Sequence, residues 1–392
     1  MILFIPAEAE KDCPEISPRR SGIAAMFYGK EGTEPSCGVS VREKTMTAQY
    51  QSNSKELAWV HWLRAAAAFA VVVIHVCSKD FTVPLPSSAV WQTLNAYESM
   101  VHWAVPVFVM ISGALLLDPV RELPLKKLFG KYFLRIFAVL VFWSLFYAVL
   151  YTGVYLRGSL RQILFAAWEG YPHLWYLYML LGLYLVTPLL RPLACSARAM
   201  RYFVILAGVF SVLLPTLGLF DLAPFLRFFA SRLDVSLVLG YAGYFVLGRL
   251  LSCSLPGKRL RVCLYVLALG GTAAAVLIDG LGSAARGEIF IPLMDSFSPC
   301  TALQAAALFV FFRAAAGEGA APRWVKDLSG LSFGIYLIHQ IPVDFLRRFC
   351  GLSTLTLHPL VSVPLIALLS YALSALAASA LKRIPLLRKT IE

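Results

Sequence analysis

The stretch LAWVHWLRAAAAFAVVVIHVC, residues 57–77, decides the fold class of this chain. It is long enough to cross a bilayer as a helix, which takes about 20 apolar residues. Its only basic side chains are His61, Arg64 and His75. At about 100° per residue, Arg64 and His75 lie on one stripe of that helix, about 16 Å apart along its axis. Insertion of an arginine near the middle of a membrane helix costs about 2.5 to 3.5 kcal/mol of free energy on insertion scales, so such a side chain normally faces a polar cavity or a partner group. This pattern indicates a functional site on the helix.

The composition agrees with a membrane protein. Hydrophobic residues make up 59% of the 392 residues and charged residues only 15%, which is typical of polytopic membrane proteins. We therefore predict an all-α integral membrane protein with about ten transmembrane helices. The eighth and ninth of these helices are interrupted by polar or helix-breaking residues, which are Asp295, Pro299, Ser329 and Gly334. The predicted spans are residues 57–77, 95–117, 132–154, 174–190, 202–220, 235–251, 262–278, 289–312, 328–346 and 357–381.

The loop charges predict the orientation of these spans. One set of alternate connections carries 19 lysine and arginine residues, and the other set carries eight. Positively charged loops are retained in the cytoplasm, so both termini are predicted to be cytoplasmic. The same retention and contact with anionic lipids account for the net charge of +13, and we expect no nucleic-acid partner.

The chain ends differ from the apolar part. Residues 1–55 show no helical or strand period, and we predict a polar, disordered extension, with the hypothesis that translation begins at Met46. Residues 57–381 form the predicted membrane domain, and residues 382–392 form a basic cytoplasmic tail. The eight cysteines show no spacing typical of a metal or redox site, so we expect inert thiols and no metal.

The predicted orientation places several polar residues at one depth near the external surface. They are His75, Glu98, His102, His173 and His339. Imidazole is suited to taking a proton from a hydroxyl near neutral pH, so convergence of these histidines would form a catalytic site. For each histidine alone, placement at the membrane boundary or a hydrogen bond between packed helices is the alternative.

Four motifs carry a resemblance to a known family. The run WLRAAAAFAVVVIHV (62–76) resembles the first-helix R-x10-H motif of the acyltransferase-3 family, integral membrane enzymes that acylate bacterial surface glycans. Three further segments resemble later signatures of that family in the same order. They are VPVFVMISGALLL (105–117), HLWYLYMLLGLYLVTPLLRPL (173–193) and LSFGIYLIHQ (331–340).

The resemblance implies an enzyme of the bacterial cytoplasmic membrane that moves an acyl group, acetyl by preference, from cytoplasmic acyl-CoA to a hydroxyl of a surface or lipid-linked glycan. It implies that His75 is a general base or a transient acyl carrier and that Arg64 is an essential cation. Arg135 matches the second arginine of an R-x-x-R motif, but Tyr132 stands at the first position, with Lys131 beside it. We expect Arg64, Arg135 and Lys131 to attract the phosphates of the donor.

Further residues take candidate roles on the same resemblance. Glu98, His102, His173 and His339 are candidates for orienting His75 or contacting the acceptor. Trp175 and Tyr336 stack on a sugar ring or belong to an aromatic belt at the membrane surface. Ser112 and Gly113 match a serine-glycine pair that serves close helix packing or the site.

The resemblance also concerns the branch of the family and its partners. About a dozen residues follow the last span, which leaves no room for a second, SGNH-type domain, so we expect the single-domain branch. That branch is similar to enzymes that O-acetylate enterobacterial common antigen. Glycan-assembly proteins are expected partners.

Two other classes of function stay open on the sequence. A secondary transporter or flippase would also have about ten helices and a charged residue within the membrane, but such proteins often contain two similar halves, and none is evident here. The other class is a membrane sensor domain that binds a small molecule and regulates a partner.

Overall fold

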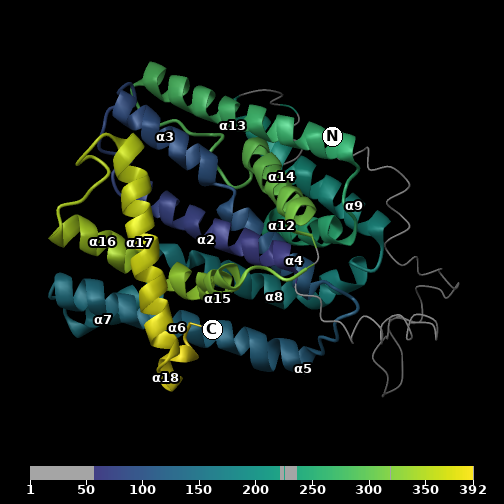
Figure 1. The fold of residues 1–392 in the computed structure, drawn as a ribbon, viewed down its shortest axis with the longest axis horizontal. Helices are drawn as coiled ribbons and strands as arrows, with labels where there is room; N and C mark the ends of the chain where they lie inside the picture. The colour runs from purple at the N-terminus through teal and green to yellow at the C-terminus, as the bar shows by residue number, and fades with distance from the viewer. Residues whose placement is uncertain (1–56, 221–224, 226–235, 318, 392) are drawn as a thin grey trace, which may run out of the picture.

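The computed structural model describes residues 57–220, 225, 236–317 and 319–391 (Figure 1). The predicted extension of residues 1–55 and the hypothetical start at Met46 lie outside these ranges. The elements named in the described ranges are all helices. They are α2 (Ala58–Ser78), α3 (Ala89–Val101), α4 (Ala104–Leu116), α5 (Leu125–Lys127), η3 (Leu128–Phe133), α6 (Leu134–Tyr147), η4 (Ala148–Tyr155), α7 (Leu160–Glu169), η5 (Pro172–Leu174), α8 (Trp175–Leu193), α9 (Ala197–Ala207), η6 (Gly208–Leu213), α10 (Leu214–Leu219), α12 (Ser236–Cys253), α13 (Lys258–Arg286), α14 (Pro299–Ala316), α15 (Arg323–Ile338), α16 (Gln340–Phe349), α17 (Pro359–Lys382) and α18 (Pro385–Arg388).

Eight helical stretches of the described residues are long and apolar enough to cross a membrane. This confirms the predicted class, an all-α polytopic membrane protein. The count is eight where the sequence predicted about ten. The eight are Ala58–Ser78, Ala89–Leu116, Leu125–Tyr155, Leu160–Leu193, Ala197–Leu219, Lys258–Arg286, Pro299–Ala316 and Pro359–Lys382.

Three predicted spans differ from the structure in where their helices begin, bend or break. The span 328–346 is divided between α15 and α16, which meet at His339. The span 235–251 corresponds to α12, which is kinked at Gly240. The span 289–312 begins as a helix only at Pro299, because the Ser298 side chain caps α14 by accepting from the Thr301 amide at 3.1 Å. Serine followed by proline is a typical helix start.

Helix α2 lies at the centre of the bundle. It packs against α3, α4, α14, α15 and α17, and Leu63, Ala67 and Val72 are fully buried. In Figure 1 α17 crosses α2 and α15 steeply, so its C-terminal end reaches the part of the bundle where α6 lies. A polar side chain on such a helix faces either a neighbouring helix, as His61 does where its Nδ1 lies 3.0 Å from Ser329 Oγ, or an internal cavity.

Glycines allow α4 and α12 to approach closely. A methyl group on Gly113 would overlap the carbonyl oxygen of Phe245, and one on Gly248 would overlap the carbonyl oxygen of Met110. Small residues serve such close packing in membrane proteins. Gly113 of the predicted serine-glycine pair therefore packs against α12.

Candidate active site

A cavity of about 480 Å³ lies among α2, α4, α6, α8 and α15. Arg64, Val71 and His75 contribute one wall from a single face of α2. Val71 follows Arg64 by about two helical turns, and His75 follows Val71 by about one turn. Residues at these intervals lie on one stripe of a helix. The cavity therefore runs along α2 from the level of Arg64 to the level of His75.

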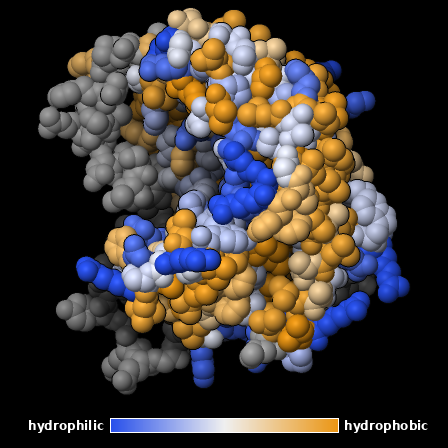
Figure 2. All heavy atoms as spheres, turned by 90° about the vertical axis from the view of Figure 1, so that its left-hand side faces the viewer, coloured by the Kyte–Doolittle hydropathy of each residue, from blue (hydrophilic) through white to orange (hydrophobic). Residues whose placement is uncertain are grey.

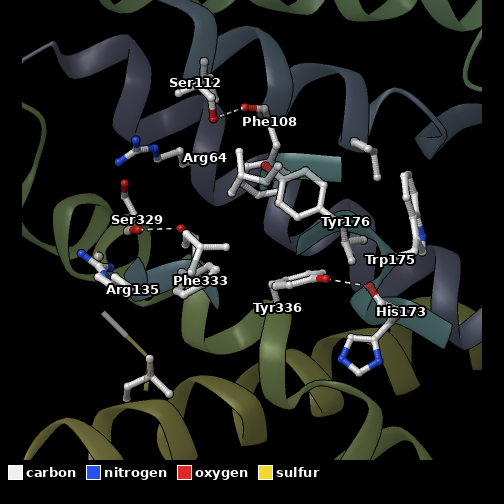
Figure 3. A pocket seen from close by; sticks show the side chains of 18 of the residues that line it. Arg64, Phe108, Ser112, Arg135, His173, Trp175, Tyr176, Ser329, Phe333 and Tyr336 are labelled. Atoms are coloured by element: carbon white, nitrogen blue, oxygen red, sulfur yellow. Dashed lines mark hydrogen bonds between the residues drawn. The ribbon is translucent and has the colours of Figure 1, made fainter. Parts of the chain in front are cut away.

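One end of the cavity is basic. Arg64, Arg135 and Lys382 line it, together with the hydroxyl groups of Ser329 and Ser332. Figure 3 shows Arg64, Arg135, Ser112 and Ser329 on one side of the cavity. None of the lining residues that the structure describes is acidic. Within the same described ranges, no carboxylate is in ion-pair contact with Arg64.

The other end of the cavity holds histidine and aromatic side chains, among them His173, Trp175 and Tyr336 (Figure 3). The ring centroid of His75 lies 4.7 Å from that of His339 and 6.3 Å from that of His173. The rings of His173 and His339 are 5.2 Å apart. Three histidines from distant parts of the sequence thus form one cluster, in which His75 and His173 line the cavity and His339 lies behind them.

Hydrogen bonds orient two members of this cluster. His339 Nδ1 lies 2.6 Å from the carbonyl oxygen of Tyr336, so a proton on Nδ1 donates to it. The Nε2 atom of His339 lies 3.4 Å from the side-chain amide of Gln340. Tyr336 in turn donates its hydroxyl to the backbone carbonyl of His173 at 2.6 Å. Both ring nitrogens of His173 are buried, and among the residues that the structure describes neither has a hydrogen-bond partner, which leaves them available to a ligand or a proton.

Local breaks in helices bring these side chains together. His339 is the residue at which α15 ends and α16 begins, and His173 lies in the short turn η5 before α8. His75 is in the last turn of α2. A residue at a helix end can turn its side chain toward a cavity that a continuous helix would pass by.

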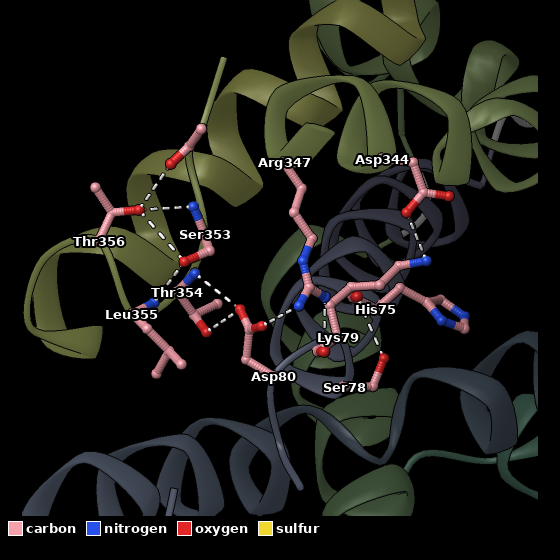
Figure 4. A network of polar contacts seen from close by, with 11 residues as sticks. His75, Ser78, Lys79, Asp80, Asp344, Arg347, Ser353, Thr354, Leu355 and Thr356 are labelled. Carbon is pink, nitrogen blue, oxygen red and sulfur yellow. Dashed lines mark hydrogen bonds and ion pairs between the residues drawn. The ribbon is translucent and has the colours of Figure 1, made fainter. Parts of the chain in front are cut away.

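A network of charged side chains lies one turn beyond His75 (Figure 4). Lys79 Nζ is 2.8 Å from Asp344 Oδ1, and Tyr151 donates its hydroxyl to the other oxygen of Asp344. Arg347 binds Asp80 at 2.7 Å and donates to the carbonyl oxygen of Lys79 at 2.7 Å. These contacts fix α16, and with it His339, to the end of α2. The face of the molecule that bears α16 shows hydrophilic side chains gathered around a hollow between apolar surfaces (Figure 2).

The structure places the remaining predicted residues in several environments. Ser112 lines the cavity and donates to the Phe108 carbonyl oxygen at 2.9 Å. Trp175 lines it as well, 43% exposed and 5.7 Å from the Tyr241 ring. Lys131 is exposed in η3 and does not line the cavity.

Two of the predicted residues, Glu98 and His102, do not line the cavity. Glu98 is buried, and its carboxylate lies 3.5 Å from Nδ1 of His102. Their helix, α3, ends directly before His102. In the described part of the chain, no ring contact joins His102 to the other three histidines. The expected convergence of four histidines is therefore a cluster of three.

Sequence reasoning missed several lining residues. Tyr176 and Tyr184 follow one another at two-turn spacing on α8, and Ser329 and Ser332 at one-turn spacing on α15. Polar side chains repeated at helical spacing within apolar segments are a signal that could have identified them. Lys382 carried no such signal, because only the crossing of α17 brings it to the cavity.

The cluster could hold a proton or a substrate. Among the residues that the structure describes, no group of three histidine, cysteine or acidic side chains has an arrangement that could hold a metal ion. The basic end suits an anionic group, and the histidine end suits proton transfer.

A comparison with protein families finds a match to the acyltransferase domain of the acyltransferase-3 family over residues 57–379. No curated protein and no solved structure matches the chain. The matched range contains the four motifs noted in the sequence and the cavity-lining residues other than Lys382 and Ile391.

Proposed function

Because this chain belongs to the acyltransferase-3 family and is a membrane acyltransferase, we propose that it transfers an acyl group, acetyl by preference, from acyl-CoA to a hydroxyl of a surface or lipid-linked glycan. The observation that carries the proposal is the single cavity wall formed by Arg64, Val71 and His75, with cations at one end and histidines at the other.

The basic end supports an acyl-CoA donor. Arg64 and Arg135 line a cavity with no acidic residue among its described walls, and guanidinium groups bind phosphates through paired hydrogen bonds. In the orientation predicted from the loop charges, this end faces the cytoplasm, where acyl-CoA is made. The narrow part of the donor then extends along α2, and its thioester reaches His75.

The histidine end supports acyl transfer. As general base, His75 takes the proton of the acceptor hydroxyl while the oxygen attacks the thioester carbonyl. The new C–O bond forms, the C–S bond breaks, and coenzyme A leaves as a thiolate that takes up a proton. In the other route, a ring nitrogen of His75 accepts the acyl group first and then passes it to the hydroxyl. His173 and His339 orient His75 in both routes.

A series of tyrosine rings supports a sugar as the acceptor. The ring of Tyr171 lies 5.3 Å from His173 and 4.8 Å from Tyr151, and Tyr155 follows at 5.4 Å from Tyr151. All three tyrosines are partly exposed, so the series leads from the histidines toward the surface. Aromatic rings with a polar tip suit the mixed apolar and hydroxylated faces of a sugar.

We propose the bacterial cytoplasmic membrane as the location and the lipid bilayer and glycan-assembly proteins as partners. The acceptor is a glycan handled at the outer surface of that membrane, as for enzymes that O-acetylate enterobacterial common antigen. These assignments rest on the family resemblance and on the loop charges.

The test uses the full chain in liposomes with radiolabelled acetyl-CoA inside and lipid-linked glycans in the membrane. Covalent label in the glycan supports the proposal. Label that crosses without covalent change would favour a transporter, and binding with neither outcome would favour a sensor. Quenching with denaturant near neutral pH within one turnover separates the two routes, because a transient acyl-histidine, which acid would hydrolyse, then retains label on the protein.

A further inference from the structure

Three basic side chains lie at the end of α2 that holds the histidine cluster, and two of them have carboxylate partners (Figure 4). Lys79 Nζ is 2.8 Å from Asp344 Oδ1, and Arg347 Nη2 is 2.7 Å from Asp80 Oδ1. The third is Arg348, which is exposed in the last turn of α16. Among the residues that the structure describes, no carboxylate forms an ion pair with Arg348. Its charge is therefore not balanced by a neighbouring acid.

Two tyrosine rings hold Arg348 in place. Its Cζ atom lies 5.0 Å from the centroid of the Tyr155 ring and 5.8 Å from that of the Tyr151 ring. A guanidinium group is attracted to aromatic faces, and its N–H groups point outward in the plane of the fork, where they can donate to an anion. In the described part of the chain these N–H groups have no hydrogen-bond acceptor. The arginine is thus positioned by contacts that leave its donors to a ligand.

The two rings belong to the series of tyrosines that leads from the histidine cluster toward the surface. The ring of Tyr171 lies 4.8 Å from that of Tyr151 and 5.3 Å from that of His173. Tyr151 is fixed in this series because its hydroxyl donates to Asp344. Two tyrosine rings therefore separate Arg348 from His173, and a ligand that reaches both would lie along the tyrosine faces.

Contact with lipid headgroups is the alternative role for Arg348, since arginines near helix ends often extend to the membrane surface. The faces of α16 argue against it. Phe345 and Phe349 are 49% and 64% exposed, and their rings lie 5.4 Å apart, so they form an apolar face suited to lipid. Arg348 instead lies one turn after Asp344, on the face that Tyr151 contacts. The guanidinium group is therefore on the side of α16 that faces the tyrosine series.

We propose that Arg348 binds an anionic group of the acceptor, so that the substrate is an acidic glycan or glycolipid rather than a neutral one. This inference rests on the proposed function, whose acceptor it narrows. The anion is the carboxylate of a uronic acid or the phosphate that joins a glycan to its lipid, since guanidinium binds either through two parallel hydrogen bonds. Because Tyr151 and Tyr171 lie between Arg348 and the histidines, this group is separate from the sugar ring that carries the reacting hydroxyl.

The test measures calorimetric binding of three octyl-linked sugars to the full chain in nanodiscs of zwitterionic lipid. Octyl glucoside is neutral, octyl glucuronide carries a carboxylate on the sugar, and octyl glucosyl phosphate carries a phosphate between the chain and the sugar. The unmodified chain is expected to bind an anionic compound about 5- to 15-fold more tightly than octyl glucoside, between the effect of an exposed ion pair and that of a charge-assisted hydrogen bond. The preferred anionic compound identifies the source of the charge.

Arg348→Gln is expected to abolish this preference, and Arg348→Lys is expected to retain part of it, because lysine keeps the charge without the planar fork. Arg286→Gln is the matched control. Arg286 is also exposed in the last turn of a helix, with its Cζ 3.5 Å from the centroid of the Phe290 ring, and that ring is not part of the tyrosine series. This control removes the same charge and should keep the full preference.

Equal binding of the three compounds by the unmodified chain, or binding of none of them, would overturn the proposal. A preference that survives in Arg348→Gln would do the same, and so would an equal loss of affinity for all three, which would assign Arg348 to packing or to bilayer lipid. Label transfer from acetyl-CoA to lipid-linked glycans is measured separately. Transfer without an anion preference would remove the role of Arg348 alone, whereas an anion preference without transfer would overturn the proposed function and leave the anion subsite.

Discussion

The imidazole rings of His75 and His339 lie 4.7 Å apart, although one belongs to the last turn of α2 and the other to the break between α15 and α16. His339 is held by the Tyr336 carbonyl oxygen, whereas His75 faces the cavity. One ring is thus fixed and the other is accessible, which is the arrangement expected for a reacting histidine beside a positioning histidine.

His75→Ala is expected to lower acyl transfer at least about 100-fold, since general base catalysis contributes about 10²- to 10⁴-fold. The measurement is label transfer from acetyl-CoA to glycan in liposomes. His358→Asn is the control, because His358 is exposed and caps α17, and asparagine is also a good cap. Normal turnover in His75→Ala would remove the central assignment.

Arg64→Ala is expected to raise the KM for acyl-CoA strongly, because Arg64 has no carboxylate partner in the described structure and is available to the donor. Arg64→Lys preserves the charge but not the planar fork, so its KM should lie between those of the alanine variant and the unmodified protein. Initial-rate measurements over a range of donor concentrations check both. Full activity in Arg64→Ala would show that this cation takes no part.

Tyr336→Phe is expected to reduce turnover by displacing His173, because the Tyr336 hydroxyl donates to the His173 carbonyl oxygen. The loss of this bond should cost about 0.5 to 1.5 kcal/mol of stability. Tyr97→Phe loses a similar bond, from the Tyr97 hydroxyl to the Leu360 carbonyl oxygen, away from the cavity. Thermal unfolding should change similarly in both variants, and activity only in Tyr336→Phe; an equal fall in activity would count against the positioning role.

Gly113→Ala is expected to destabilise the protein by about 1 to 3 kcal/mol, the usual cost of overpacking, because the added methyl overlaps the Phe245 carbonyl oxygen. Gly182→Ala in α8 is the matched control, since among the described residues no atom beyond its own chain neighbours and helix backbone lies within 4 Å of the added methyl. Alanine there should be neutral or stabilising. Thermal unfolding in detergent measures both, and equal stability of the two variants would contradict tight packing of α4 on α12.

Several features of the site followed from the sequence because they are local. Helical periodicity places Arg64 and His75 on one stripe, and both line the cavity. The serine-glycine pair divides as neighbouring helix positions must, with Ser112 toward the cavity and Gly113 toward α12. The predicted depth of a residue in the membrane, however, did not identify the neighbours that its side chain contacts. His102 shares the predicted depth of His75 but contacts Glu98 instead.

The sequence by itself determined the membrane class, the family and the stripe on α2, because apolar length, motif order and helical period are properties of contiguous residues. Only the tertiary structure decided that His173 and His339 join His75, and that Lys382 and Ile391 line the cavity. These contacts depend on helix breaks and on the crossing of α17. Such features arise from packing between distant segments, which no local pattern of residues encodes.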